Sequence, residues 1–351
     1  MKMIDFTDCK KLVNSYEGAD LKNKIEYLGD VYMLKFGQKL VPDSNKPMQA
    51  SYSSAPVSEY LGSHIFELAG IPVQETLLGT YDGKVVVACK DFLECQPNAA
   101  ELVLVEFKKL ENSYLASSTA GGRTPLYDNL VGVFSKHESL GDLRAEAEDR
   151  YWQTFVMDAL IGNFDRHAGN WGYVLNKAEN RIVDLAPVYD CGSSLYPQLN
   201  EKTMQELMRD RTLLEERVRT FPRAALRIGK SKVRYHEFLL SPEGSKARRA
   251  LGEILPRIDF KKVNELIQQT PYISEVRREF YTHLLEARTD VILRPAYELY
   301  REERALEGDS PSKDVEVSLG SEASDCRAAA KALEDSGQTQ TPILDGQNQS
   351  R

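Results

Sequence analysis

The sequence predicts an α+β protein with two lobes, a small β-rich lobe followed by a larger and mostly helical one. Three observations lead to this prediction. Pairs of short β-prone runs surround a single helix within residues 1–95, helical periodicity prevails over residues 96–305, and both patterns stop in residues 306–351. The chain has 351 residues and 42% of them are hydrophobic, which is enough to bury a large core.

The first lobe is expected to contain two strand pairs and one helix. Apolar residues recur with helical spacing over Val57–Ala69 and stop at Gly70, a residue type that often follows the last turn of a helix. The β-prone runs meet at turns that contain glycine, and they are Lys24–Tyr27 with Val31–Phe36 and Gln74–Thr80 with Lys84–Cys89. This order predicts a small sheet packed against one helix.

The second lobe is expected to be organised around a helix that ends at Gly162. One face of this helix is apolar and is formed by Trp152, Phe155, Val156, Ala159 and Leu160. Short strands are expected after it, at Gly172–Leu175 and Arg181–Asp184. Amphipathic segments predict further helices over 201–219, 259–269 and 273–303. Residues 111–150 are polar and contain glycine, so they are expected to form a loop-rich region.

Several classes of protein are poor interpretations of this composition. No apolar stretch approaches the roughly 18–20 residues that cross a bilayer, and the N-terminus lacks the apolar run of a signal peptide. The five cysteines are scattered and never form a C-x-x-C pair, which argues against a disulfide scaffold and a zinc ribbon. The expectation is a cytoplasmic globular protein without a membrane partner.

The acidity of the chain is concentrated at its C-terminus. Residues 307–351 hold nine acidic and four basic side chains, which gives −5 of the total net charge of −8. This stretch has no aromatic residue and is rich in Ser, Asp, Gln and Gly, so it cannot bury enough apolar surface to fold. Residues 306–351 are therefore predicted to be a disordered acidic tail. Net acidity also argues against a surface built mainly to wrap nucleic acid.

A polar loop follows the strong helix and is the first candidate for chemistry. In Ile161–Asn170, Asp165 and Asn170 are five residues apart. A kinase catalytic loop has this spacing, because its Asp accepts the proton of the acceptor hydroxyl while its Asn binds magnesium. A helix-to-strand turn capped by Asn and Asp explains this segment equally well when it is taken alone.

A second carboxylate stands in Tyr189-Asp190-Cys191-Gly192, after a short apolar run. A kinase needs such a carboxylate to bind the magnesium ion that bridges the phosphates of ATP. The competing interpretation is a common turn. Cys191 as a nucleophile is a poor alternative, because no base stands at a definable spacing from it.

Lys35 lies inside the otherwise apolar run Tyr32–Phe36. A lysine is costly to bury without a partner, and kinases place one at such a position to reach the α- and β-phosphates, paired with a glutamate on the next helix. Glu59 is the candidate for this glutamate and Glu67 is its competitor. A lysine on the solvent face of an edge strand is the other explanation.

Upstream, Ser15–Lys22 carries one glycine and a lysine before the first β-prone run, so its backbone N–H groups could approach a phosphate. On its own this signal is weak. The order of the signals along the chain strengthens all of them, since phosphate loop, strand lysine, helix glutamate, Asp…Asn loop and metal aspartate follow one another as in a kinase.

With these motifs the chain resembles the HipA family of bacterial serine/threonine kinases. Four segments carry the resemblance: Ser15–Lys22, Tyr32–Phe36, Ile161–Asn170 and the LAPVYDCGSSL run that contains Asp190. The Asp-x-His-x-x-Asn order of the catalytic loop is specific, because ordinary protein kinases place His-Arg before the Asp. The resemblance implies a two-lobed kinase-like fold and an ATP-dependent phosphotransferase that uses ATP and Mg²⁺. Because few residues precede Ser15, the chain is similar to compact members without the extra N-terminal domain.

The resemblance also implies a role for each residue of the site. Asp165 would be the catalytic base, Asn170 and Asp190 would bind magnesium, and Ser15 would be the site of autophosphorylation. The ATP site would include Lys35 with Glu59, the phosphate loop of Glu17, Gly18, Ala19, Asp20, Leu21 and Lys22, the adenine hinge of Lys90, Asp91 and Phe92, and His167 and Tyr189.

The partners implied are a protein substrate with a Ser or Thr acceptor, an antitoxin and a substrate associated with tRNA. The basic stretch Lys202–Arg234, with ten basic and four acidic residues, is either a solvated helical face or a docking surface for an acidic protein or a protein–tRNA complex. Two alternative functions stay open at this point. One is a nucleotide-binding regulatory module without turnover, and the other is a kinase that acts on a small molecule.

Overall fold

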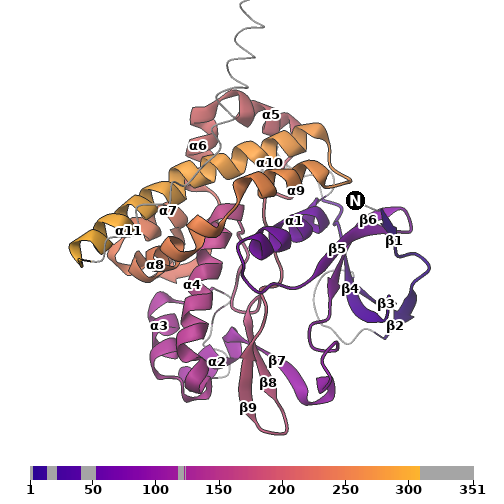
Figure 1. Ribbon diagram of the computed structural model, residues 1–351, viewed down its shortest axis with the longest axis horizontal. Coiled ribbons are helices and arrows are strands. Elements are labelled where there is room, and N and C mark those ends of the chain that lie inside the picture. Colours follow the sequence, from indigo (N-terminus) through magenta and orange to yellow (C-terminus); the bar gives the residue numbers. More distant parts are fainter. Residues whose placement is uncertain (1–2, 14–21, 41–52, 118–121, 123, 309–351) are drawn as a thin grey trace, which may run out of the picture. The chain divides into compact units, whose positions relative to one another are not determined.

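The computed structural model describes residues 3–13, 22–40, 53–117, 122 and 124–308 (Figure 1). The chain divides into one compact unit over Met1–Lys313 and a second over Asp314–Arg351, and the described residues all belong to the first. The predicted lobe limits at residues 95 and 305 and the predicted disorder of residues 306–351 stay predictions.

The first part of the chain folds into a mixed sheet. Its strands are β1 (Ile4–Asp5), β2 (Lys10–Leu12), β3 (Lys22–Tyr27), β4 (Asp30–Phe36), β5 (Thr76–Tyr81) and β6 (Lys84–Lys90). Within the described residues their order is β1-β5-β6-β4-β3-β2, antiparallel throughout except for the parallel pair β1 and β5. Gly79 allows this parallel pair to form closely, because a Cβ there would lie 2.5 Å from the carbonyl oxygen of Ile4.

Both predicted hairpins are present, and each turns through two residues with positive φ. Leu28 and Gly29 have φ of 53° and 88°, while Asp82 and Gly83 have φ of 48° and 71°. Positive φ at both central residues gives a turn whose twist matches the right-handed twist of the strands. The turns therefore fix the register that pairs Lys22 with Lys35 across β3 and β4.

The two faces of this sheet pack against different cores. One face closes over a small cluster formed by Phe6, Ile25, Tyr32, Leu34, Tyr81, Val86 and Ala88. The other face carries Leu78, Val87 and Cys89, which join the main core of the protein together with helix α1 (Ala55–Leu68). Lys35 pairs with Val87 in the ladder and therefore lies on the face that meets α1.

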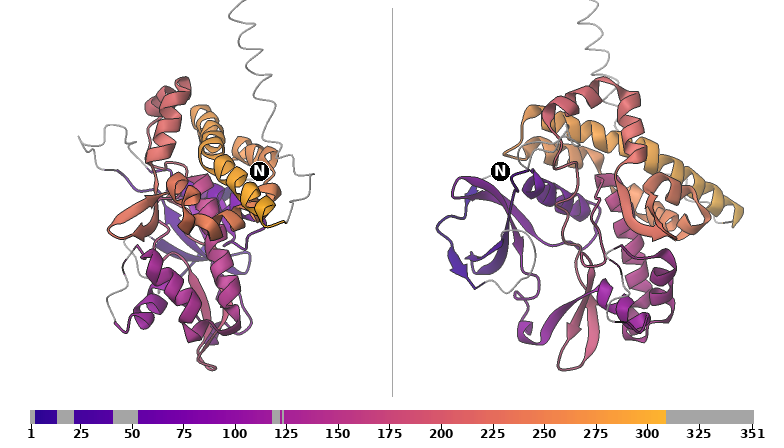
Figure 2. Two further views of the ribbon diagram at one scale, coloured as in Figure 1. Left: turned by 90° about the vertical axis from the view of Figure 1, so that its left-hand side faces the viewer. Right: turned by 180° about the vertical axis from the view of Figure 1, so that it is seen from behind.

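The rest of the described chain is mostly helical. The helices are α2 (Phe107–Tyr114), α3 (Tyr127–Lys136), α4 (Arg144–Ile161), α5 (Glu201–Arg209), α6 (Arg211–Thr220), α7 (Tyr235–Leu240), α8 (Ser245–Ile254), α9 (Phe260–Gln269), α10 (Glu275–Arg288) and α11 (Arg294–Leu306). A small sheet joins β7 (Leu102–Glu106), β8 (Gly172–Asn176) and β9 (Arg181–Leu185), and β10 (Arg223–Ile228) pairs with β11 (Ser231–Arg234). Figures 1 and 2 show the β7–β9 sheet at one end of this unit and α5 and α6 at the other.

The expected loop-rich region at 111–150 is a wrong prediction. This range holds the second half of α2, all of α3, the 3₁₀ turn Glu138–Leu143 and the start of α4. Its helices are short, and their buried residues Leu110, Leu130, Val133 and Phe134 are stabilised by burial in the main core rather than by strong local periodicity. The strands β7, β10 and β11 were also not predicted.

The predicted helices at 201–219 and 273–303 are each interrupted. Asp210 separates α5 from α6, because its side chain accepts a hydrogen bond from the backbone N–H of Leu213 and caps α6. A π-helical turn at Thr289–Leu293 separates α10 from α11. Within the described ranges, no helix combines the length and the apolar character needed to cross a membrane.

Helix α1 is tied to the helical part of the protein at both ends. Before its first turn, the N–H of Ser54 donates to the carbonyl of Pro197 at 2.8 Å, and Arg277 of α10 donates to the Ser54 hydroxyl at 3.1 Å. After its last turn, the N–H of Gln74 donates to the carbonyl of Val188 at 2.8 Å. The strand lysine and the segment around Asp190 are thereby brought to the same side of α1.

Candidate active site

Lys35 is held between two carboxylates that are far apart in the sequence. Its Nζ lies 3.1 Å from Oε1 of Glu59 on α1 and 3.1 Å from Oδ1 of Asp190. Burial would lower the pKa of Lys35, but the negative charges of Asp190 and Glu59 outweigh it and hold this pKa well above its usual value. Of the two predicted glutamate partners, the structure pairs Glu59 with Lys35 and leaves Glu67 exposed.

Two glycines allow α1 to approach the loop that contains Asp190. A Cβ on Gly62 would lie 2.7 Å from the Cβ of Cys191, and a Cβ on Gly192 would lie 3.0 Å from Oε2 of Glu59. Neither position has room for a larger side chain without a shift of the neighbouring segment. The glycines therefore set the distance at which Glu59 meets Lys35 and Asp190.

The predicted catalytic loop begins where α4 ends. Gly162 has φ of 67°, the left-handed conformation that commonly ends a helix. Asn163 is fully buried, donates from its amide to Oδ1 of Asp158 at 3.1 Å and accepts the backbone N–H of Asp165 at 3.1 Å. These bonds fix the backbone on which Asp165 stands.

Arg166 connects the catalytic loop to the segment around Asp190. Its guanidinium forms an ion pair with buried Asp158, with Nε 2.9 Å from Oδ2, and donates to the carbonyl of Asn170 at 3.1 Å. It also donates to the carbonyl of Tyr189. Burial would lower the pKa of Arg166, but the carboxylate of Asp158 outweighs it, so the arginine stays charged.

The other loop residues are ordered by hydrogen bonds to one another. The amide of Asn170 donates to the carbonyl of Asp165 at 2.9 Å, and the N–H of Gly169 donates to Nδ1 of His167 at 3.0 Å. The hydroxyl of Tyr189 donates to the carbonyl of Gly169 at 3.0 Å. Asp165, His167, Asn170 and Tyr189 therefore belong to one connected unit.

Of the three predicted hinge residues, Phe92 is the one whose ring lies next to that of Tyr189. The N–H of Lys90 donates to Glu75 and that of Asp91 donates to Val31, so both amides are used within the protein. The ring of Phe92 lies 6.1 Å from the ring of Tyr189 at an interplanar angle of 30°. Two aromatic rings at this angle suit the recognition of a planar base.

Some predicted site residues lie outside the described residues. They are Ser15, Glu17, Gly18, Ala19, Asp20 and Leu21. The backbone of Lys22 is described as the first residue of β3, directly opposite Lys35 in the ladder.

A known protein family matches this chain. The family model described as "HipA-like C-terminal domain" matches residues 14–258, which is more than half of the chain. The chain belongs to this family. The HipA-like kinase is 37% identical over 300 residues to the serine/threonine-protein kinase CtkA of Helicobacter pylori, covering 85% of this chain and 88% of that relative.

A solved structure agrees with the fold. The crystal structure of the Helicobacter pylori proinflammatory kinase CtkA matches with a TM-score of 0.76 and 32% identity, covering 86% of this chain and 99% of that one. HipA of Shewanella oneidensis MR-1, in a complex with HipB and operator DNA, matches with a TM-score of 0.48 and 14% identity over 82% of this chain and 67% of that one. The predicted family, the two-lobed α+β fold and the enzyme class of protein kinase are confirmed.

The donor set of the HipA-like kinase fits magnesium bound together with nucleotide phosphates. Among the described residues there is no group of three or more His, Cys, Asp or Glu side chains that could hold a metal on its own. Asp190 and Asn170 offer a carboxylate and an amide oxygen, and Mg²⁺ at kinase sites takes one or two such oxygens together with phosphate oxygens and water. These two residues would therefore hold the ion only with the nucleotide.

Sequence reasoning missed the residues that support the loop from behind. Asp158, Asn163 and Arg166 form the buried hydrogen-bonded cluster, and the hydroxyl of Tyr235 donates to the carbonyl of Asn163 at 2.8 Å. A signal existed, because Asp158 is the one charged residue in the apolar run Thr154–Ile161. A lone acid on a buried helix face requires a partner, and the nearby loop supplies Arg166.

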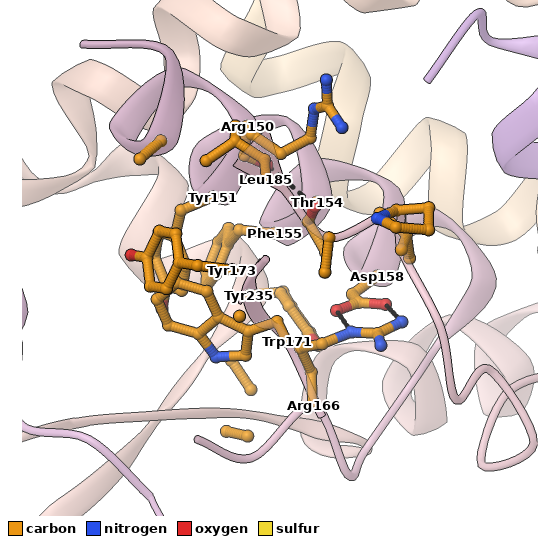
Figure 3. A pocket seen from close by; sticks show the side chains of 17 residues that line it. Arg150, Tyr151, Thr154, Phe155, Asp158, Arg166, Trp171, Tyr173, Leu185 and Tyr235 are labelled. Carbon is orange, nitrogen blue, oxygen red and sulfur yellow. Dashed lines mark hydrogen bonds and ion pairs between the residues drawn. The ribbon is translucent and has the colours of Figure 1, made fainter. Parts of the chain in front are cut away.

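A cavity of about 40 Å³ lies behind the catalytic loop of the HipA-like kinase. Figure 3 shows that the ion pair of Asp158 and Arg166 faces it beside Trp171 and Tyr235. Its lining is largely apolar, so the ion pair is shielded from water and the loop geometry is protected.

Proposed function

We propose that this HipA-like kinase transfers the γ-phosphoryl group of ATP to a serine or threonine hydroxyl of a protein, with magnesium as cofactor. The observation that carries the proposal is the position of Lys35, whose Nζ lies within 3.1 Å of both Glu59 and Asp190. A phosphoryl-transfer site needs a cation fixed beside the metal carboxylate, so that the phosphate charge is neutralised without reorganisation.

Each residue has a role in this reaction. Asp165 orients the acceptor hydroxyl and accepts its proton, and Lys35 binds the α- and β-phosphates. Asn170 and Asp190 would hold magnesium, which supplies neutralisation of the phosphate charge when bound. Phe92, His167 and Tyr189 would surround the nucleotide, with Lys90 and Asp91 completing the hinge. The segment Glu17–Lys22 would bind phosphate through its backbone.

Autophosphorylation of Ser15 is part of the proposal. Phosphate adds about −2 charges, which would oppose ATP bound next to the phosphate loop and so switch the enzyme off. The support for this role is the place of Ser15 within the family motif. Cytoplasmic location, an antitoxin partner and a tRNA-associated substrate stay predictions.

The arrangement favours turnover over a binding module without activity. Such a module would not require Glu59, Lys35 and Asp190 to meet while Arg166 aligns the catalytic loop. A small-molecule kinase would share the same site and differ only in its acceptor.

Labelled ATP and Mg²⁺ test the proposal directly. The wild-type chain should label a protein acceptor or itself, whereas Asp165→Asn and Asp190→Asn should lower the initial rate by about 10²–10⁴-fold. Asp142→Asn, at an exposed aspartate, is the matched control and should keep the wild-type rate. Equal labelling by all four proteins would refute the assignment. ATP-induced thermal stabilisation without labelling in any of them would identify the module without turnover.

A further inference from the structure

One arginine near the catalytic loop differs from its neighbours in its partners. The guanidinium carbon of Arg217 in α6 lies 4.6 Å from the centre of the Phe221 ring and 5.4 Å from that of Tyr196. Its Nε is buried and has no hydrogen-bond partner in the described part of the chain. Among the described residues no carboxylate lies within ion-pair distance of it. The contact with two rings positions this cation, and no carboxylate of the described residues neutralises its charge.

The rings that hold Arg217 continue to the catalytic loop. Phe221 lies 6.0 Å from Phe164, the residue directly before Asp165. Tyr196 lies 5.3 Å from Phe221 and donates its hydroxyl to the Phe221 carbonyl at 2.7 Å. We call Phe164, Tyr196, Arg217 and Phe221 the acceptor shelf. It extends from Phe164, next to the predicted catalytic base, to Arg217.

The backbone holds the shelf in a fixed shape. Leu195 and Tyr196 have φ of 56° and 53°, a left-handed conformation that side-chain-bearing residues rarely adopt twice in succession. The N–H of Leu195 donates to the carbonyl of Ile161 at 2.9 Å, which ties this turn to the end of α4. The Tyr196 ring is therefore placed by the same helix end that places Asp165.

Some other cations of the basic stretch Lys202–Arg234 form ion pairs within the protein, whereas Arg209, Arg223, Lys230 and Lys232 are exposed and have no ion pair among the described residues. Arg211 pairs with Glu215 at 2.8 Å and with Asp290 at 2.9 Å, Arg219 lies 3.8 Å from Glu215, and Arg234 pairs with Glu237 at 2.6 Å. Arg217 differs from these exposed cations because it is held against the rings of Phe221 and Tyr196, and Phe221 lies 6.0 Å from Phe164, next to Asp165. A single flat guanidinium bordered by rings suits one planar carboxylate.

We infer that the acceptor shelf selects protein acceptors in which an acidic side chain stands near the phosphorylated serine or threonine. Arg217 binds the carboxylate, while Phe164 and Phe221 contact the apolar part of the acceptor chain next to Asp165. The inference rests on the proposed function, because it assigns the substrate class of the same site.

Two synthetic peptides with one serine and the same frame test this inference, one with flanking Glu and Asp and one with Gln and Asn instead. Phosphorylation rates are measured with labelled ATP, and fluorescent versions with Ser replaced by Ala report binding. The wild type should prefer the acidic peptide by about tenfold or more in kcat/KM and in affinity, because one hydrogen bond between charged groups contributes a free energy of this size. Arg217→Gln should treat the two peptides alike, and Arg217→Glu should reverse the preference.

Arg219→Gln is the matched control on the same helix and should keep the preference. Arg217→Lys keeps the positive charge but not the planar guanidinium, so it should keep part of the preference for the acidic peptide. This variant provides the test if Arg217→Gln does not fold. Equal affinity of the wild type for both peptides would overturn the inference. An RNA oligonucleotide that binds through Arg217 while the peptides do not would overturn it in favour of nucleic acid. Selective binding of the acidic peptide without any phosphoryl transfer would support the role of the acceptor shelf and refute the proposed kinase function.

Discussion

At the residue scale, buried Arg166 and its partner Asp158 hold the two loops of the site in register. Arg166 reaches the carboxylate of Asp158 and the carbonyls of Asn170 and Tyr189 with one guanidinium. A planar group with several donors in fixed directions can make these bonds at the same time, which a lysine could not do. The cost of burying the charge is offset only while every partner is in place.

Arg166→Gln should therefore lower the free energy of unfolding by about 3–5 kcal/mol, because it leaves Asp158 buried without a counter-ion. Denaturant titration followed by circular dichroism measures this change. Arg304→Gln breaks the more exposed pair with Glu307 and should change stability by at most about 1 kcal/mol. Similar losses for the two variants would contradict the structural role given to Arg166.

Glu59→Gln should lower kcat/KM for ATP by about 10²-fold, because Lys35 loses one of the two charges that fix its position. Glu67→Gln, about two turns further along the same helix but exposed, should have no such effect. If Glu59 acts through Lys35, the double variant with Lys35→Met should be no slower than Lys35→Met alone. Additive losses would show that Glu59 has a separate role.

At the element scale, the position of α1 depends on the absence of a side chain at Gly62. Glycine in a helix costs about 1 kcal/mol relative to alanine, so its presence in the middle of α1 requires a reason. The reason is contact with the loop of Asp190, where Cys191 approaches to within 2.7 Å of the place that a Cβ would occupy.

Gly62→Ala should consequently destabilise the protein by about 1–3 kcal/mol despite its better helix propensity, and should lower kinase activity. Unfolding titrations and initial rates on the same samples give both quantities. Cys191→Gly removes the opposing Cβ, so the double variant should recover part of the loss. A gain in stability for Gly62→Ala alone would mean that α1 does not depend on this contact.

At the scale of the whole molecule, the features that could be predicted from the sequence were those that a phosphate site or a turn requires of particular residue types. Lys35, Glu59 and Asp190 could be named in advance because a phosphate site needs these charges in this order, although 155 positions separate Lys35 from Asp190. The hairpins and α4 also followed from turn residues and apolar spacing. The roles of Lys35, Glu59 and Asp190 in ATP binding stay predictions.

Other parts had no local signal. The helices within residues 111–150 gain their stability from burial in the main core, which periodicity in a short polar segment does not reveal. The hinge was placed by sequence position, and no pattern could show that the amides of Lys90 and Asp91 are used within the protein. The acceptor shelf joins Tyr196, Arg217 and Phe221 through ring contacts that depend on the tertiary fold.

Two partly buried histidines make the stability of the protein depend on pH. Burial lowers the pKa of His137 and of His236, and in both side chains Nδ1 is buried without a hydrogen-bond partner among the described residues. Below the ordinary value of about 6.5 the unfolded chain binds protons that the folded protein does not, so stability falls as the pH decreases.

The urea midpoint should therefore be lower at pH 5.5 than at pH 7.5. Replacing both histidines, as His137→Gln with His236→Gln, should flatten this dependence. His283→Gln, at an exposed histidine, should leave the slope as it is. An unchanged slope in the double variant would mean that other groups cause the pH dependence.

Helix α1 is fastened at its start by Ser54, along its side by Gly62 against Cys191, and beyond its end by Gln74. These contacts oppose an outward swing of α1 that would separate Glu59 from Lys35. We therefore expect regulation to act on the entry of nucleotide and acceptor rather than through displacement of this helix.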